Sequence, residues 1–143
     1  MKPKILKLLK GMTSDSKKKS YKCENELCEI LTSVCNKLKT IEISVGYNRR
    51  FYPDKITEID SENVYTVMYT GMEKLPEIIW CNDGNFGFPT KWLDIDYKSY
   101  FEDVKHKSID NKTKTIKNVE FSLNKHKEEL ESLKKLNYET LCR

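Results

Sequence analysis

Alanine and glutamine are both absent from this chain of 143 residues, whereas lysine, isoleucine, asparagine and tyrosine are abundant. Absences of this kind reflect the nucleotide composition of a gene more than any demand of folding. They favour an AT-rich genome, such as that of a virus, a phage or an intracellular parasite.

Long apolar runs are missing as well, and no stretch approaches the roughly 18 residues that a membrane-spanning helix requires. The five cysteines are odd in number and contain no C-x-x-C pair, which argues against both a disulfide framework and a zinc site. We therefore expect no metal, no cofactor and no transmembrane segment. A reducing, cytoplasmic setting fits this cysteine usage best.

Catalytic motifs are scarce. The chain contains no phosphate-binding glycine loop and no G-x-S-x-G nucleophile motif. Pro53-Asp54 followed by Asp96-Tyr97-Lys98 resembles the PD…(D/E)xK pattern of metal-dependent nucleases, in which two carboxylates bind Mg²⁺. The separation is long, however, and Asp96 stands where a helix is expected to start. We therefore expect no catalytic residues, and the nuclease remains a remote alternative.

The formal charge of +4 conceals a division along the chain. Residues 1–47 carry ten lysines against five acids, residues 48–104 carry six basic residues against eleven acids, and residues 105–143 carry ten against six. Opposite charges of this kind can be satisfied within one molecule or between copies of it. The basic pI is therefore weak evidence for nucleic-acid binding.

Three parts are expected: a short amphipathic helix and a basic linker over residues 1–20, an α+β core over 21–104, and a coiled-coil-like helix over 105–143. The first helix could dock on its own domain, on a partner or on a membrane surface. The linker would run from Gly11 to Ser20. Helical spacing of apolar residues predicts a helix over Glu24 to Lys39. Alternating residues then predict a strand over Ile41 to Val45.

The strongest local signal is a β-hairpin. Residues 64–69 and 78–81 are rich in β-branched and aromatic side chains, and Asp83-Gly84 is typical of a hairpin turn. Gly87 indicates a bulge or a close backbone approach, and Pro89 should end the strand. With further strands at 41–45 and around 56–59, we expect a small antiparallel sheet of about five strands, which could curl like an SH3-type or Tudor-type barrel and is flanked by helices.

Two groups of aromatic residues are candidate binding elements. One cluster consists of Trp80, Phe86, Phe88 and Trp92. It could form core packing or an aromatic pocket for a peptide or a base. The other is a loop with interleaved arginines, made of Tyr47, Arg49, Arg50, Phe51 and Tyr52. Arginine and aromatic side chains together are typical of base-stacking surfaces, although the arginines could equally pair with nearby acids.

The C-terminal part shows a heptad pattern over a helix from about Lys112 to Tyr138. Its apolar or aromatic a and d positions are Ile109, Ile116, Val119, Leu123, His126, Leu130 and Leu133. Lys112 is a polar residue at an early d position, and Asn137 is one at a late a position. A seam this narrow requires another helix, whether a second copy, the helix at 24–39 or a foreign partner.

These patterns favour a non-catalytic binding protein, an accessory, regulatory or inhibitory factor that acts by stoichiometric protein-protein interaction. We expect a homo-oligomer, a host protein partner or both. The alternative is a nucleic-acid-binding protein that uses Arg49 and Arg50 with the lysine-rich flanks.

Overall fold

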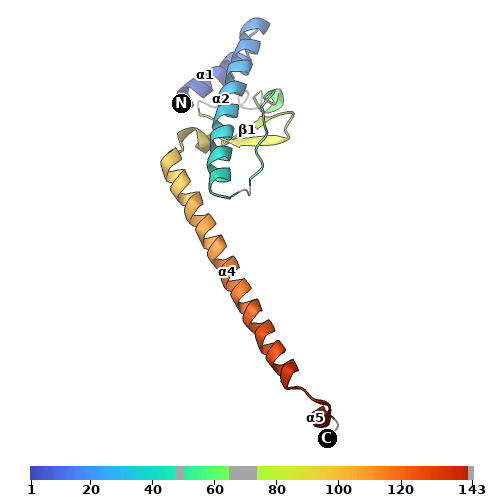
Figure 1. The fold of residues 1–143 in the computed structure, drawn as a ribbon. Helices are drawn as coiled ribbons and strands as arrows, with labels where there is room; N and C mark the ends of the chain where they lie inside the picture. The colour runs from blue at the N-terminus through green and yellow to red at the C-terminus, as the bar shows by residue number, and fades with distance from the viewer. Residues whose placement is uncertain (48–49, 65–73, 142–143) are drawn as a thin grey trace.

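The computed structural model of this chain describes residues 1–47, 50–64 and 74–141. Its named elements are α1 (Lys2–Met12), α2 (Lys17–Ser44), β1 (Ile78–Cys81), β2 (Phe86–Pro89), the 3-10 helix η1 (Thr90–Asp94), α4 (Tyr97–Lys135) and α5 (Tyr138–Leu141). Figure 1 shows that α1, α2, the hairpin and η1 gather into one head, from which most of α4 projects. The fold is therefore helix-rich, with a small sheet and a long C-terminal helix.

The amphipathic helix α1 docks on its own chain. Its apolar side chains Ile5, Leu8 and Leu9 are buried, and the helix packs along α2. A helix of this length is only marginally stable alone in water, so this packing is what maintains it. The face that could have bound a membrane is thereby occupied.

The expected linker is shorter than the sequence indicated, because α2 begins at Lys17 rather than near Glu24. The Ser16 side chain accepts a hydrogen bond from the Lys19 backbone N–H, an N-terminal cap that favours helix initiation there. The three lysines at 17–19 therefore form the first turn of α2, and only residues 13–16 connect the two helices.

The expected strand at 41–45 is wrong, since α2 continues through Ser44. Alternation of isoleucine with polar residues suggested a strand, but the buried positions Cys35, Leu38 and Glu42 continue the helical period of the preceding turns. The helix ends at Ser44, and Gly46 follows the C-cap residue Val45 with a φ of +69°. The backbone N–H groups of Gly46 and Tyr47 donate to the Ile43 and Glu42 carbonyls, as in a Schellman motif.

The hairpin prediction is confirmed. Strands β1 and β2 pair antiparallel, with Trp80 opposite Gly87 and Cys81 opposite Phe86. Asn82, Asp83 and Gly84 between them all have positive φ values, which this turn chemistry favours. The pairing is continuous through Gly87, so there is no bulge. The predicted close approach is present, because a Cβ on Gly87 would lie 2.9 Å from Ile78 Cγ2.

The expectation of about five strands and an SH3-like barrel is wrong: the sheet in the described residues has two strands. Ile59 forms a single bridge to Cys81. At this bridge the Asp60 N–H donates to the Trp80 carbonyl and the Asn82 N–H donates to the Glu58 carbonyl. Before it, side chains accept from the backbone, since the Ile56 N–H donates to Thr32 Oγ1 and the Thr57 N–H donates to Asn82 Oδ1. Of the expected strand at 64–69, Val64 is helical and residues 65–69 lie outside the described residues.

One hydrophobic core joins α1, α2, the hairpin and η1. The residues most completely removed from solvent include Ile5, Leu27, Leu31, Leu38, Ile56, Cys81 and Phe88. The core ends near the first turns of α4, where Val104 is the last buried apolar side chain of that helix.

Candidate protein-protein interface

The head holds α4 by its first three turns. Asp96 caps the helix, its carboxylate accepting from the Lys98 N–H and the Ser99 hydroxyl. Further along, Val104 and Ser108 are buried, and the Ser108 hydroxyl donates to the Val45 carbonyl over 2.6 Å. Beyond Ser108, α4 buries no further side chain in the described part of the chain.

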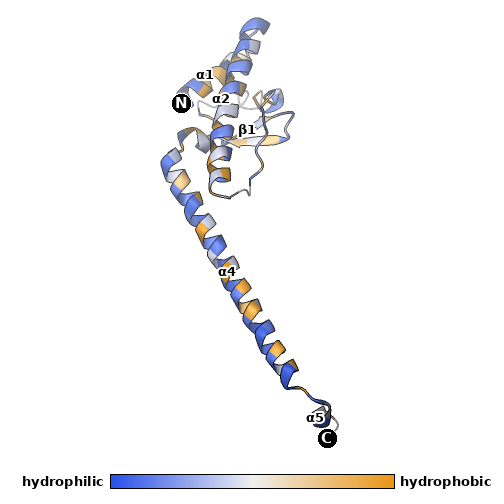
Figure 2. Ribbon diagram, in the orientation of Figure 1, coloured by the Kyte–Doolittle hydropathy of each residue, from blue (hydrophilic) through white to orange (hydrophobic). Residues whose placement is uncertain are grey.

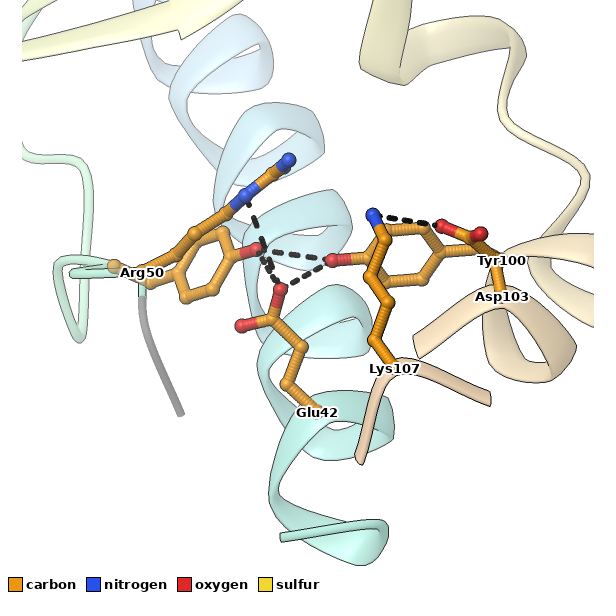
Figure 3. A network of polar contacts seen from close by, with 6 residues as sticks. Glu42, Arg50, Tyr100, Asp103 and Lys107 are labelled. Atoms are coloured by element: carbon orange, nitrogen blue, oxygen red, sulfur yellow. Dashed lines mark hydrogen bonds and ion pairs between the residues drawn. The ribbon is translucent and has the colours of Figure 1, made fainter. Parts of the chain in front are cut away.

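A polar cluster around Glu42 fastens this attachment (Figure 3). Glu42 is 1% exposed, and its Oε1 accepts hydrogen bonds from the hydroxyls of Tyr52 and Tyr100. The Arg50 Nε lies 4.0 Å from the same oxygen. One buried carboxylate thus connects the end of α2, the segment after Arg50 and the start of α4.

The electrostatics of this cluster favour neutral phenols. Burial raises the pKa of Tyr100, and the hydrogen bond to Glu42 raises it further. Burial likewise raises the pKa of Tyr52. Glu42 Oε2 is the one buried side-chain oxygen or nitrogen in the described residues that has no hydrogen-bond partner. Within this carboxylate, Oε1 therefore accepts two hydrogen bonds and Oε2 accepts none.

Beyond this attachment the heptad residues lie in the open. We call the residues Ile109, Ile116, Val119, Leu123, His126, Leu130 and Leu133 the α4 stripe. Its six apolar members are between 50% and 66% exposed. Figure 2 shows apolar segments recurring along the projecting part of α4. From Ile109 to Lys135 this part extends about 40 Å at ~1.5 Å per residue.

The alternative in which the stripe packs against the helix at 24–39 finds no support. Contact between α2 and α4 involves the base of α4, and the stripe begins where that contact ends. Helices in proteins gain most of their stability from packing their apolar face against other parts of the structure. Here that face remains available to a second molecule.

The arginine-aromatic loop is divided by the fold. Tyr52 is buried and Tyr47 half-buried, while Phe51 is 85% exposed. The Arg50 guanidinium lies over the Trp92 ring at 5.7 Å and beside Glu42, so it faces the head rather than a ligand. Arg49 lies outside the described residues.

Three members of the aromatic cluster meet in the core. The rings of Phe86 and Phe88 lie 6.3 Å and 5.3 Å from that of Trp92, with Tyr52 at 5.6 Å on the same indole. Trp80 is separate, since β1 alternates and turns it to the partly exposed face. A cavity beside Trp80, lined mainly by apolar side chains of α1 and β1, has a volume of about 30 Å³. That volume suits a water rather than a base or a peptide side chain.

The two carboxylates of the nuclease-like pattern have structural partners. Asp54 pairs with Lys39 at 3.0 Å, and Asp96 caps α4. Among the described residues no group of three His, Cys, Asp or Glu side chains is arranged to hold a metal ion.

Sequence reasoning missed the Glu42 cluster entirely, because it placed Glu42 on the solvent side of a strand. If residues 31–42 had been predicted as one helix, Glu42 would have fallen on the buried stripe with Leu31, Cys35 and Leu38. A charged residue on such a stripe signals a polar partner. That Tyr52 and Tyr100 supply it depends on contacts 10 and 58 residues away, which no local pattern encodes.

Compared with known proteins, the chain matches no family model, and no curated protein and no solved structure matches it. No helix in the described ranges is both long and apolar enough to cross a membrane.

Proposed function

We propose that this chain is a non-catalytic binding protein that acts by stoichiometric association through the α4 stripe. The head anchors the helix, and the projecting helix presents the contact surface. The observation that carries this proposal is the seven-residue spacing of half-exposed apolar side chains along α4.

The size of the stripe supports an association of moderate strength. Covering half of one such side chain contributes on the order of 1 kcal/mol. Association costs at least about 4 kcal/mol in lost freedom of motion. Two copies of the six-residue apolar set thus suffice for an affinity in roughly the micromolar range.

The nucleic-acid alternative has less support. Arg50 and Tyr52 face the head, and lysines of the basic first helix have acidic partners: Lys2 pairs with Asp94 and Lys4 with Glu26. Binding through phosphate contacts would weaken steeply as salt rises, whereas an apolar seam would not.

Sedimentation of the purified full chain over a range of concentrations tests the proposal. We expect a concentration-dependent increase in mass for the natural sequence and loss of that increase in Leu123→Ser, which removes an apolar residue from the stripe. Phe121→Ser is the matched control, because Phe121 is 74% exposed and lies on the opposite face of α4. Its association should be unchanged. A chain that stays monomeric at high concentration would contradict self-association through α4.

A further inference from the structure

We infer that the α4 stripe from Ile116 to Leu133 is covered by the α4 of a second copy of this chain running in the opposite direction, so that the two heads lie at opposite ends. This inference rests on the proposed function and specifies its partner. It is carried by the charge along α4, by the pairing of the flanking charges and by the place where the second α4 ends relative to the head.

Charge is unevenly distributed along α4. Residues 105–117 carry five lysines and one aspartate, whereas residues 118–135 carry four lysines and four glutamates. A parallel pair would set the two strongly basic segments side by side. An antiparallel pair places the two basic segments at opposite ends of the dimer, so that they no longer face each other.

One antiparallel register accommodates the polar residues of the seam. It places Ile116 opposite Leu133 of the second copy, Val119 opposite Leu130, and Leu123 opposite His126, and each layer occurs twice by symmetry. Lys112, the polar residue at a d position, then lies at the end of the paired region, where its ammonium group can reach water. A parallel pair would instead place Lys112 opposite Lys112 and His126 opposite His126.

The charges beside the seam favour the same register. It brings Glu120 close to Lys127 of the second copy, again twice, and neither residue has an ion-pair partner in the described part of its own chain. The corresponding parallel pair would be Glu129 with Lys134. Both already have partners on their own helix, since Glu129 lies 3.4 Å from His126 and Lys134 lies 3.6 Å from Glu131.

In this arrangement α4 of the second copy ends before it reaches the head, and α5 (Tyr138–Leu141) follows that end. In the proposed register, Lys135 of the second copy lies level with residue 114 of the first. It therefore stops about 9 Å before Ser108, at ~1.5 Å per residue, where α4 leaves the head. A parallel pair would require both heads at one end, with helix axes only about 8–10 Å apart.

Charge reversal in the full chain, measured as the dimer dissociation constant at low salt, tests the orientation. We expect Lys127→Glu to weaken the dimer roughly tenfold, because it converts two attractive pairs into repulsive ones. The double variant E120K/K127E should restore most of the affinity. The matched controls are the single variant K134E and the double variant E129K/K134E. They test the Glu129–Lys134 pair that a parallel dimer would form. These variants should leave the dissociation constant within about twofold of the natural value.

Spin-label distances give an independent readout. Asp110→Cys, in a chain whose Cys23 and Cys142 are replaced by serine, places one label on the outer side of each helix. The antiparallel register separates the two labels by about 44 Å along the axis, at ~1.5 Å per residue. A parallel pair has no axial offset, so its labels would lie within about 20 Å.

The outcomes separate the two proposals. A dimer with a short label distance, or one weakened by K134E and rescued by E129K/K134E, overturns the antiparallel orientation and leaves association through α4 intact. A chain that never dimerises overturns the pairing with a second copy and leaves only a foreign partner for the α4 stripe. Circular dichroism of each variant establishes that α4 remains helical.

Discussion

The two long helices of this protein carry the same kind of apolar stripe and use it differently. In α2, the stripe that includes Leu27, Leu31 and Leu38 is fully covered by α1, the hairpin and η1. In α4, the stripe beyond Ser108 is covered by nothing in the described residues of the same chain. Periodicity therefore tells which face of a helix is apolar, but not whether that face closes a core or an interface.

The largest expected effect comes from replacing a leucine by alanine in the α2 stripe, compared with the same replacement in the α4 stripe. Leu31→Ala should lower the free energy of unfolding of the head by about 2–5 kcal/mol, because it leaves a cavity at a residue with no exposed surface. The matched Leu123→Ala, measured by urea denaturation at concentrations where the chain is monomeric, should change that free energy by less than about 0.5 kcal/mol. Equal losses in the two variants would mean that the α4 stripe is covered within the chain.

A smaller effect concerns the joint between the two helices. Glu42→Ala should cost about 1–3 kcal/mol of stability, because it removes the buried carboxylate that accepts from the hydroxyls of Tyr52 and Tyr100. Glu42→Gln retains an amide oxygen as acceptor and should cost less. Glu128→Ala serves as the control and should be nearly neutral, because Glu128 is exposed and lies on the face of α4 away from the stripe.

Amide hydrogen exchange shows which part of the protein loses stability in Glu42→Ala. Amides of residues 97–104, at the base of α4, should exchange faster in Glu42→Ala than in the natural protein, while those in the middle of α2 should not. A uniform increase over the whole head would show that Glu42 supports the core rather than the joint.

The smallest expected effect is a loss of stability at alkaline pH. The folded state holds Tyr52 and Tyr100 protonated with raised pKa values, whereas the unfolded chain loses these protons near the ordinary value of 10.0. Between those values the unfolded state binds fewer protons, so the contribution of the two tyrosines to stability should be fully present below pH 10 and be lost as pH rises above it. The buried thiols of Cys28, Cys35 and Cys81, whose pKa values burial raises from 9.0, add a fall of their own that begins near pH 9. Denaturation midpoints at pH 8 and pH 11 measure this fall. Tyr100→Phe should reduce it, and an identical fall in that variant would remove Tyr100 as a cause.

Local signals predicted several elements well. They include the Asp83-Gly84 turn, the strand over 78–81 and the end of β2 at Pro89, because each depends on residues close in sequence. The long C-terminal helix was predicted too, but α4 begins at Tyr97 rather than near Lys112 and ends at Lys135 rather than near Tyr138. The strand predicted at 41–45 failed because Ile41, Glu42, Ile43 and Ser44 fit both a short strand and the last turns of a helix. Only the folded structure shows that these residues are helical, because there Glu42 is buried on the same face of α2 as Leu38.

The sequence by itself determined the helical periods, the hairpin turn and the heptad spacing on α4, because these follow from side-chain chemistry over a few residues. Only the tertiary structure decided that the head closes around α2 with a two-stranded sheet, that Tyr52 and Tyr100 donate to Glu42, and that α4 leaves the head at Ser108 with its stripe exposed. The physical reason is that burial is a property of what surrounds a residue. Those surroundings are assembled from segments far apart in the chain.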